Sequence, residues 1–513
     1  MERVFRRGTR FVDESGRQVQ FNGVNLSLKG EKKGKRTVYS FDSVTEEGIA
    51  SLHRRGINLI RLILTWDGVE PLPGVYQEEY LNHYRQIISW CEKYGIYFIL
   101  DMHQDLYSRQ IGDGAPDWAS LSGGYPFEKP ALIWAEGYFY SRAVAHCFEN
   151  FWRNVPVNGK GLQDYYAAMW RHVAARFCDS PALLGFDVLN EPFPGLSGNE
   201  VFCLLIDGFM EKLGGAPMNT ARYFKGRHDR LGFLKMAAAA AGRFASAGMS
   251  RVKAVGEDEQ ALREIVRRAE PLIRRFDEEY YSPFLSRMAA AIRDVTDRGI
   301  LFMENCYYSN IGIPCAVRIP TVRGVPEEQV AFAPHAYDIF IDSPLYRYAS
   351  NTRAGLFFGE HRRTQERLGV PVLVGEWGGF SAHSGYREHA EFLLRLFEEN
   401  GWSRCYWLWD PAHFDRHPIR DMICRSYPQA VCGEVRSLCS DGDGIRITYE
   451  QREDRGERNR FYLSGPVRTF TVNGVPVPPS RYSFTPSGGK EQGGILHFSA
   501  PHGENRVEIT VQR

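Results

Sequence analysis

The sequence LGFDVLNEP at residues 184–192 is an apolar, strand-like run that ends in a carboxylate, Glu191. A second run, VLVGEW at residues 372–377, carries Glu376 in the same place. Short apolar runs predict interior strands, and a side chain just past such a strand lies at the rim, where loops build sites on a rigid scaffold. Two glutamates in this position indicate paired acid/base and nucleophile chemistry. Hydrolysis of a glycosidic bond needs such a pair, because one carboxyl group protonates the departing oxygen while the other attacks or stabilises the anomeric carbon.

Strand-like and helix-like runs alternate through most of the chain. This alternation predicts a parallel sheet with crossover helices, and its eightfold count predicts an α/β fold, the (β/α)8 TIM barrel. The eight expected strands are residues 19–25, 57–64, 96–102, 184–189, 300–304, 330–335, 372–376 and 405–409. The expected helices between them include residues 45–55, 78–94, 163–177, 259–297 and 386–400.

The barrel is expected to occupy residues 1–430, with an insertion at about residues 195–258. A connection after the fourth strand leaves from the catalytic face of a barrel, so the insertion is expected to form a lid or apolar wall, or else a peripheral helical hairpin. Its apolar residues can line a groove for a lipid tail, although packed helices use the same residues more often as core. These residues are Phe202, Leu204, Leu205, Ile206, Phe209 and Met210.

The pattern changes near the C-terminus. From about residue 433, helical periodicity gives way to short alternating runs, and Asn473-Gly474 between two of them is a hairpin turn signal. Residues 431–513 are therefore expected to form a C-terminal antiparallel β-sandwich. Such a module either binds carbohydrate or stabilises the barrel by packing against it. Packing is favoured, because this segment shows no obvious row of tryptophans.

The charge balance narrows the possible partners. The 513 residues include 63 basic and 62 acidic ones, a net charge of +1, so no strong field favours nucleic acid, and we expect no nucleic-acid partner.

No apolar run approaches the ~18 residues of a membrane span. Residues 1–7 lack the apolar stretch of a signal peptide, so we expect a protein that stays inside the cell or one whose leader was removed. Ten cysteines without CxxC spacing disfavour a zinc site or a tight disulfide framework, although an exported protein can still form one or two bridges.

Further polar and aromatic side chains follow other predicted strands and are expected to converge on the same rim. Any one of them alone is as well explained by a structural role. Their joint occurrence in this order along the strands is far more specific. They are Arg61 on the second strand, His103 and Asp105 after the third, Asn190 after the fourth, His335 at the end of the sixth with Tyr337 just beyond it, and Trp409 at the end of the eighth.

This ordered set, with Asn190-Glu191-Pro192 and Glu376, resembles the signature of family 5 glycoside hydrolases, a retaining group of clan A built on a (β/α)8 barrel. Within that family, three motifs look like the endoglycoceramidase and glucosylceramidase branch, as does the trailing β-domain. The motifs are DMHQDLYSR at residues 101–109, GAPDW at 114–118 and RSYPQA at 425–430.

The resemblance implies a double displacement in which Glu376 is the nucleophile and Glu191 the acid/base, with the two carboxyl groups ~5 to 5.5 Å apart. Arg61 and Tyr337 are then expected to keep Glu376 ionised, while burial and the charge of Glu376 keep Glu191 protonated before attack. The other implied roles are sugar contacts. Asn190 is expected to donate to the 2-hydroxyl, and Trp409 is expected to form the sugar platform. His103, Asp105 and His335 are expected to bind hydroxyls or orient the glutamates. Lys29 and Trp134 are expected to contact the glycone, although a solvated loop explains Lys29 more simply.

The resemblance also implies a glycosphingolipid or another β-glycoside as substrate, transient contact with a membrane or micelle surface, a monomer, and neither cofactor nor metal. Alternatives are a β-glucosidase acting on glucosylceramide or on steryl or other small-aglycone glucosides, and a β-glucan endoglucanase. A non-catalytic carbohydrate-binding barrel is the third, and the two intact glutamates argue against it. A metal enzyme is the outsider, because His103 and Asp105 can contribute ligands but no third ligand has suitable local spacing.

Overall fold

The structure, a computed structural model, describes residues 1–513 except 29, 35, 131–132, 215–217, 225–229, 336, 342–347, 381–385, 452–455, 490–491 and 513. No described helix combines the length and apolar character needed to cross a lipid bilayer.

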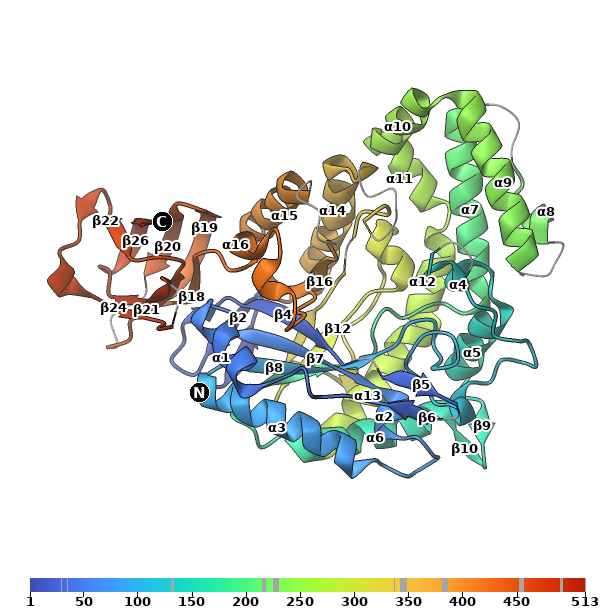
Figure 1. The fold of residues 1–513 in the computed structure, drawn as a ribbon, viewed down its shortest axis with the longest axis horizontal. Coiled ribbons are helices and arrows are strands. Elements are labelled where there is room, and N and C mark those ends of the chain that lie inside the picture. The colour runs from blue at the N-terminus through green and yellow to red at the C-terminus, as the bar shows by residue number, and fades with distance from the viewer. Residues whose placement is uncertain are drawn as a thin grey trace.

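Parallel strands form a central barrel, which confirms the predicted fold class (Figure 1). The sheet has the order β15-β12-β11-β8-β7-β4-β17-β16, and the bridges Phe332↔Val372 and His335↔Glu376 join its two outer strands. Each predicted strand run overlaps one of these strands, with ends that differ by a few residues. They are β4 (Asn22–Ser27), β7 (Leu59–Thr65), β8 (Tyr97–His103), β11 (Leu183–Asp187), β12 (Ile300–Met303), β15 (Val330–Phe332), β16 (Leu373–Gly378) and β17 (Ser403–Trp407).

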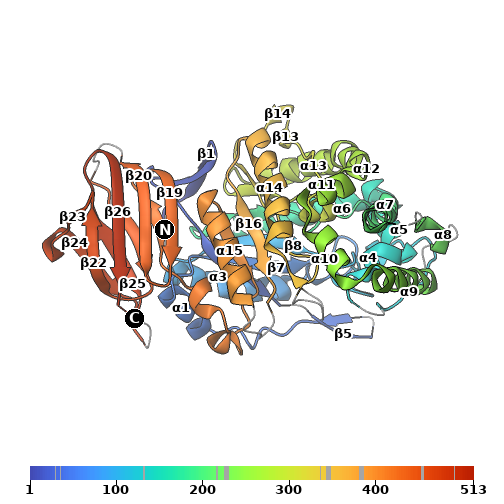
Figure 2. The same ribbon diagram turned by 90° about the horizontal axis from the view of Figure 1, so that it is seen from above.

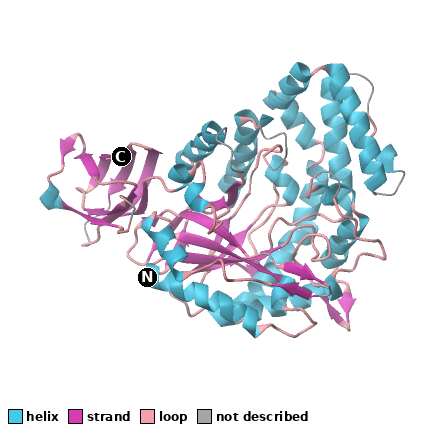
Figure 3. Ribbon diagram, viewed as in Figure 1, coloured by secondary structure: helices cyan, strands magenta, loops and turns pink. Residues whose placement is uncertain are grey.

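Helices cover the outside of this barrel (Figure 3). Local signals set their ends: the Thr45 hydroxyl accepts from the Gly48 N–H at the start of α1, and Gly95, with φ +68°, ends α3 in the left-handed conformation. The covering helices include α1 (Glu46–Arg54), α3 (Glu78–Tyr94), α6 (Leu162–Phe177), α14 (Asn351–Leu368) and α15 (Arg387–Glu399).

The single helix expected over residues 259–297 is wrong, because the chain forms four shorter segments there. The segments are α11 (Glu259–Arg267), α12 (Glu270–Phe276), a π-helical turn (Asp277–Tyr281) and α13 (Ser282–Arg293). Pro271 lies in the first turn of α12, where a missing N–H is tolerated, whereas Pro283 follows a π-helical turn through which the helical backbone continues into α13.

The insertion is helical and stands at the end of the molecule opposite the C-terminal sheets (Figures 1 and 2). It packs on α4 (Glu136–Tyr140) through Phe139 and Phe202, whose ring centroids are 4.6 Å apart. Phe202 and Met210 are buried, so core packing accounts for these two apolar residues. The helices are α7 (Leu196–Leu213), α8 (Ala221–Phe224), α9 (Arg230–Ala247) and α10 (Met249–Glu257).

The C-terminal segment forms two antiparallel sheets that share an apolar core, including a Phe470–Phe498 contact at 5.0 Å, so this part of the predicted fold is confirmed. One sheet has the order β19-β20-β26-β22-β23 and the other β1-β2-β3-β18-β21-β25-β24. A division at residue 431 would therefore leave β1–β3 and most of β18 on the barrel side. The strands are β1 (Val4–Arg7), β2 (Arg10–Asp13), β3 (Gln18–Val19), β18 (Tyr427–Val431), β19 (Gly433–Asp441), β20 (Gly444–Gln451), β21 (Asn459–Leu463), β22 (Val467–Val472), β23 (Val475–Pro476), β24 (Tyr482–Pro486), β25 (Gly494–Phe498) and β26 (Gly503–Val511).

Two contacts show how this module meets the barrel and how its hairpin turns. The Ser440 N–H donates to Glu398 Oε2 on α15 at 2.9 Å, and the Tyr427 hydroxyl donates to the Gly56 carbonyl at 2.6 Å. Asn473 and Gly474 join β22 to β23 with φ values of +54° and +77°, as the predicted turn requires. The sandwich therefore packs against the barrel.

Candidate active site

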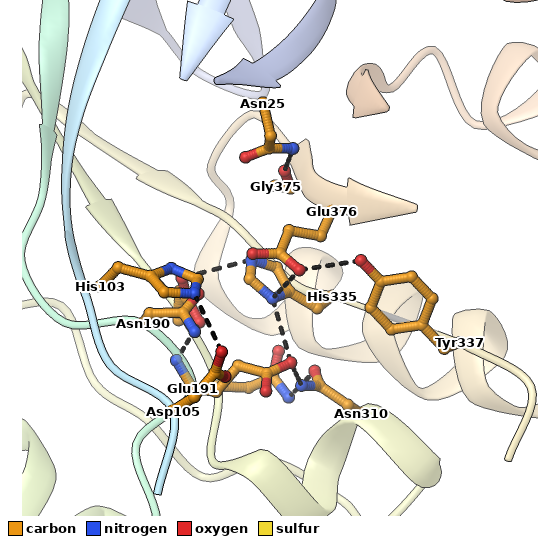
Figure 4. A network of polar contacts seen from close by, with 12 residues as sticks. Asn25, His103, Asp105, Asn190, Glu191, Asn310, His335, Tyr337, Gly375 and Glu376 are labelled. Atoms are coloured by element: carbon orange, nitrogen blue, oxygen red, sulfur yellow. Dashed lines mark hydrogen bonds and ion pairs between the residues drawn. The ribbon is translucent and has the colours of Figure 1, made fainter. Parts of the chain in front are cut away.

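Glu191 and Glu376 face each other at the carboxyl-terminal rim of the barrel (Figure 4). Glu191 follows β11, and Glu376 lies within β16. One carboxylate oxygen of Glu191, one of Glu376 and one ring nitrogen of His335 all lie within 4.8 Å of one another. Both side chains belong to buried residues. This short separation fits retaining chemistry, whereas inverting enzymes hold their carboxyl groups about 6.5–9.5 Å apart.

Arg61 on β7 is the positive charge beneath the two glutamates, and it is fully buried. Its Nη1 donates to Glu376 Oε1 at 2.9 Å, and its Nη2 donates to Glu304 Oε1 at 2.8 Å. Burial opposes this charge, but the surrounding carboxylates outweigh burial and raise the pKa of Arg61 well above its ordinary value. The remaining contacts are Asp187 Oδ2 at 3.0 Å, Asp101 Oδ1 at 2.9 Å, and Asn25 Oδ1 and Asn190 Oδ1, both at 3.1 Å.

The carboxylate of Glu376 is held at both oxygens. Oε1 accepts from Arg61, and Oε2 accepts from the Tyr337 hydroxyl at 2.8 Å. The preceding residue, Gly375, makes room for the site, since a Cβ there would lie 2.7 Å from His335 Nε2. Two donors, one of them charged, thus stabilise the carboxylate and fix its orientation.

Glu191 has a left-handed backbone, with φ +44°, which costs a residue with a side chain about 1–3 kcal/mol. Its N–H donates to Glu304 Oε2 at 2.7 Å, and its Oε1 accepts from Asn310 Nδ2 at 3.1 Å. Burial raises the pKa of Glu191, and the charges of Glu376 and Glu304 add to this, against a lowering contribution from His335. Glu191 therefore keeps its proton to a higher pH than an ordinary glutamate.

His335 lies between three carboxylates. Its Nδ1 is 3.2 Å from Glu191 Oε1 and 3.7 Å from Glu376 Oε2, and its Nε2 is 3.3 Å from Glu304 Oε1. Burial lowers the pKa of His335, but the charges of Glu304 and Glu376 outweigh burial and raise it well above the ordinary value. The carboxylates therefore favour the imidazolium form of the ring, in which both nitrogens carry hydrogens.

His103 is held in place by Asp101, whose Oδ2 lies 2.9 Å from Nδ1, while Nε2 lies 3.7 Å from Asp105 Oδ2. A loop brings Asp113 back to this pair, and the Asp105 N–H donates to Asp113 Oδ1 at 3.0 Å. Ligand atoms of His103, Asp105 and Asp113 lie within 4.8 Å of one another. Local sequence spacing did not indicate Asp113 as a candidate third ligand, because a loop brings it to this pair.

The prediction of Trp409 as the sugar platform is also wrong. Trp409 is only 3% exposed and packs near Gly48 of α1, where a Cβ would lie 3.1 Å from the indole. Trp407, at the end of β17, is partly exposed instead, and its ring stacks on His103 at 5.4 Å and 13°. The strand ends two residues earlier than its apolar pattern indicates, so the rim position belongs to Trp407.

The remaining predicted residues are Asn190, Trp134 and Lys29. The Asn190 amide donates to the Gln104 carbonyl at 3.2 Å and lies within the network. Trp134 is 41% exposed, and its ring meets Tyr138 edge-on at 6.3 Å. Lys29 lies outside the described residues.

Among the residues that contact Glu191, Glu304 and Asn310 were not predicted. Glu304 directly follows β12, and its sequence signal was available, since it is a carboxylate closing an apolar run like the other two glutamates. Asn310 lies in a short 3-10 helix (Tyr307–Ile311), and no sequence signal distinguishes it from other asparagines. Both contact Glu191.

A family model described as Cellulase (glycosyl hydrolase family 5) matches residues 12–204 and 279–413. The unmatched residues between these segments include the second half of α7 and all of α8–α12, so the helical insertion lies largely outside the part common to the family.

Individual relatives give a consistent picture. An endoglycoceramidase of Cyanea nozakii is 35% identical over 207 residues, which are 36% of this chain and 40% of the relative. Endoglycoceramidase I of Rhodococcus hoagii is 29% identical over 461 residues, which are 86% of this chain and 75% of the relative. The solved complex of endo-glycoceramidase II from Rhodococcus sp. with ganglioside GM3 has a TM-score of 0.69 at 23% identity and covers 99% of this chain and 100% of that one. The last similarity supports the fold.

Proposed function

The chain belongs to glycosyl hydrolase family 5, and from this premise we propose that it is a retaining β-glycosidase that cleaves the bond between glycan and ceramide in glycosphingolipids. The observation that carries the chemistry is the buried pair Glu191 and Glu376, with oxygens within 4.8 Å of each other. The substrate class rests on the relatives from Cyanea nozakii and Rhodococcus hoagii, which are endoglycoceramidases.

In the first step, the carboxylate of Glu376 attacks the anomeric carbon as the bond to the glycosidic oxygen breaks. The proton of Glu191 moves to that oxygen, and the ceramide leaves as an alcohol. The raised pKa of Glu191 suits this acid role. Arg61 and Tyr337 hold the attacking carboxylate in position.

In the second step, water attacks the anomeric carbon of the glycosyl-enzyme ester, the bond from that carbon to the Glu376 oxygen breaks to restore the carboxylate, and the sugar is released with retained configuration. Glu191 takes the proton of that water. Glu376 has lost its charge in the ester, so one of the contributions that raise the pKa of Glu191 is absent and its carboxylate is a better base. One residue thus serves as acid and then as base.

Around this pair, we assign sugar contacts to side chains at the rim. His103 and Asp105 bind hydroxyls, Asn190 donates to the 2-hydroxyl, and Trp407 replaces Trp409 as the stacking platform. Lys29 and Trp134 remain predicted glycone contacts. We also propose that the enzyme is a monomer and that it contacts a micelle or membrane surface transiently while it acts on its substrate.

Product analysis tests the proposed bond and substrate. The enzyme is incubated with glucosylceramide, galactosylceramide, lactosylceramide and ganglioside GM3, and both products are identified by mass spectrometry. We expect intact oligosaccharide and free ceramide from the last two, and the first-formed sugar in the β-configuration by NMR.

Other outcomes of this panel contradict parts of the proposal. Cleavage of glucosylceramide alone would favour the glucosylceramidase alternative, and cleavage of only aryl or steryl β-glucosides would show another aglycone. The same panel with Glu376→Gln corrects for background hydrolysis.

Replacement of Trp407 tests the corrected platform. We expect Trp407→Ala to lower kcat/KM by about 10- to 100-fold, since an apolar ring surface of this size contributes about 1.5–3 kcal/mol when a sugar covers it. Trp409→Ala is the matched control and is expected to lower the thermal midpoint, because it leaves a cavity in the core. Equal losses of activity in both folded variants would contradict the assignment to Trp407.

A further inference from the structure

A third buried glutamate, Glu304, contacts both halves of the site, although the double displacement assigns it no step. It directly follows β12 and is 1% exposed. One oxygen, Oε2, accepts the backbone N–H of Glu191 at 2.7 Å. The other, Oε1, accepts from Arg61 Nη2 at 2.8 Å, and Arg61 Nη1 holds Glu376. A single carboxylate thereby links the backbone of Glu191 to the side chain that anchors Glu376.

The contact with Glu191 falls on the peptide that most needs support. Glu191 has φ +44°, a conformation that side-chain-bearing residues adopt only when their surroundings impose it. An ionised acceptor gives a stronger and shorter hydrogen bond to an N–H than a neutral one. The Glu304 carboxylate thus holds the peptide that aims the Glu191 side chain at Asn310 and His335.

Glu304 is also the member of the buried acidic group that is suited to carry a permanent charge. Burial opposes its ionisation, but His335, Arg61 and the Glu191 N–H outweigh burial and lower the pKa of Glu304. Burial instead raises the pKa of Asp101 and of Asp187, which share the same guanidinium. His335 faces Glu304 with Nε2 at 3.3 Å, so the carboxylate also helps to hold this ring in place.

We propose that Glu304 is a positioning residue for the acid/base, holding the backbone of Glu191 so that its carboxyl group reaches the departing oxygen. This inference rests on the proposed glycosidase function and assigns a role within it. Asp187 provides the comparison, because its Oδ2 accepts from Arg61 Nε at 3.0 Å and no hydrogen bond joins it to Glu191 among the described residues.

Substrates with different leaving groups distinguish a loss of acid catalysis by Glu191 from a loss of nucleophilic attack by Glu376. A 2,4-dinitrophenolate departs without protonation, whereas an alkyl alcohol or ceramide needs it. In Glu304→Gln the amide has one oxygen for two donors, so either Arg61 or the Glu191 N–H faces an NH2 group. We expect kcat/KM to fall by about 10²- to 10³-fold for an alkyl β-glycoside, within the range of general acid catalysis, but by less than about tenfold for the matching 2,4-dinitrophenyl β-glycoside.

Asp187→Asn is the matched control, since it replaces another buried carboxyl that contacts Arg61. Any loss in this variant is expected to be equal for the two substrates. Equal losses for both substrates in Glu304→Gln would overturn the proposal and leave Glu304 a support of Arg61 alone. Turnover of the dinitrophenyl substrate by the parent and its loss in Glu376→Gln would show that the glycosidase proposal itself still holds.

A second measurement does not depend on turnover. In a crystal structure of Glu304→Gln, we expect the Glu191 carboxyl group to leave Asn310 and His335 while the barrel strands keep their places. Glu191 in its parent position, with φ still near +44°, would overturn the proposal whatever the activity. Circular dichroism and the thermal midpoint show whether each variant is folded before these comparisons are made.

Discussion

Glu376→Gln is expected to lower kcat/KM by at least about 10⁴-fold, equivalent to about 5.4 kcal/mol of transition-state stabilisation, while glycolipid binding persists. An amide is not a competent nucleophile, but it has nearly the size of the carboxylate. Arg61 can still donate to the amide oxygen, and the Tyr337 hydroxyl can accept from the amide nitrogen. Initial rates on lactosylceramide, with binding measured by calorimetry on micelles, separate the two effects.

A covalent label identifies the nucleophile directly. A 2-deoxy-2-fluoro-β-glycoside with a good leaving group should accumulate as a glycosyl-enzyme in the parent. The fluorine slows both steps, but the reactive leaving group keeps the first step fast enough for the ester to form before it is hydrolysed. Peptide mass analysis is expected to place the added sugar on Glu376. Label on another residue, or turnover by Glu376→Gln at the parent rate, would contradict the mechanism. Glu366→Gln, an exposed pair partner of Arg362, is the control for a glutamate change elsewhere.

Arg61→Met is expected to produce the largest loss of stability, at least about 3–5 kcal/mol, because removing one partner of a buried ion pair leaves uncompensated charge behind. Here four carboxyl groups lose the same cation: Asp101, Asp187, Glu304 and Glu376. Urea unfolding followed by tryptophan fluorescence measures the loss. Arg362→Met, an exposed i,i+4 pair with Glu366, is the matched control and is expected to stay close to the parent midpoint.

The penalty of Arg61→Met is expected to shrink as the pH falls. Without the guanidinium, buried carboxyl groups have a pKa above that of the unfolded chain, so the folded state binds more protons than the unfolded one. Stability of the variant relative to the parent then falls as the pH rises through that raised pKa, and it recovers toward pH 5. A penalty that grows on acidification would show that the carboxyl groups are not what Arg61 compensates.

Most of the barrel and the two main glutamates were predictable because their signals are local. A buried parallel strand needs a short apolar run, and the crossover helices need amphipathic ones, so eight alternations suffice to indicate the architecture. The carboxyl ends of such strands meet at one rim, which is why Glu191 and Glu376 could be placed together before any distance was known. The Asn473-Gly474 turn was predictable for the same reason, since its backbone preference is intrinsic to those two residues.

The neighbours of these glutamates depended on where strands end and loops return, and sequence periodicity leaves both uncertain by a few residues. Only Leu408 separates the buried Trp409 from Trp407 at the rim, and a loop of seven residues brings Asp113 back to Asp105. Strands β1–β3 join a sheet otherwise built from the far end of the chain, a pairing that no local pattern specifies.

The sequence by itself determined the barrel, the terminal sandwich and two carboxylates at strand ends, because hydrophobic periodicity and turn preference are properties of neighbouring residues. Only the tertiary structure decided that Glu304 holds the peptide of Glu191 and that one arginine is shared by four carboxyl groups. Those contacts join residues that are 40 or more positions apart in the chain, and their strength depends on burial and on the approach of charges, which exist only once the barrel has closed.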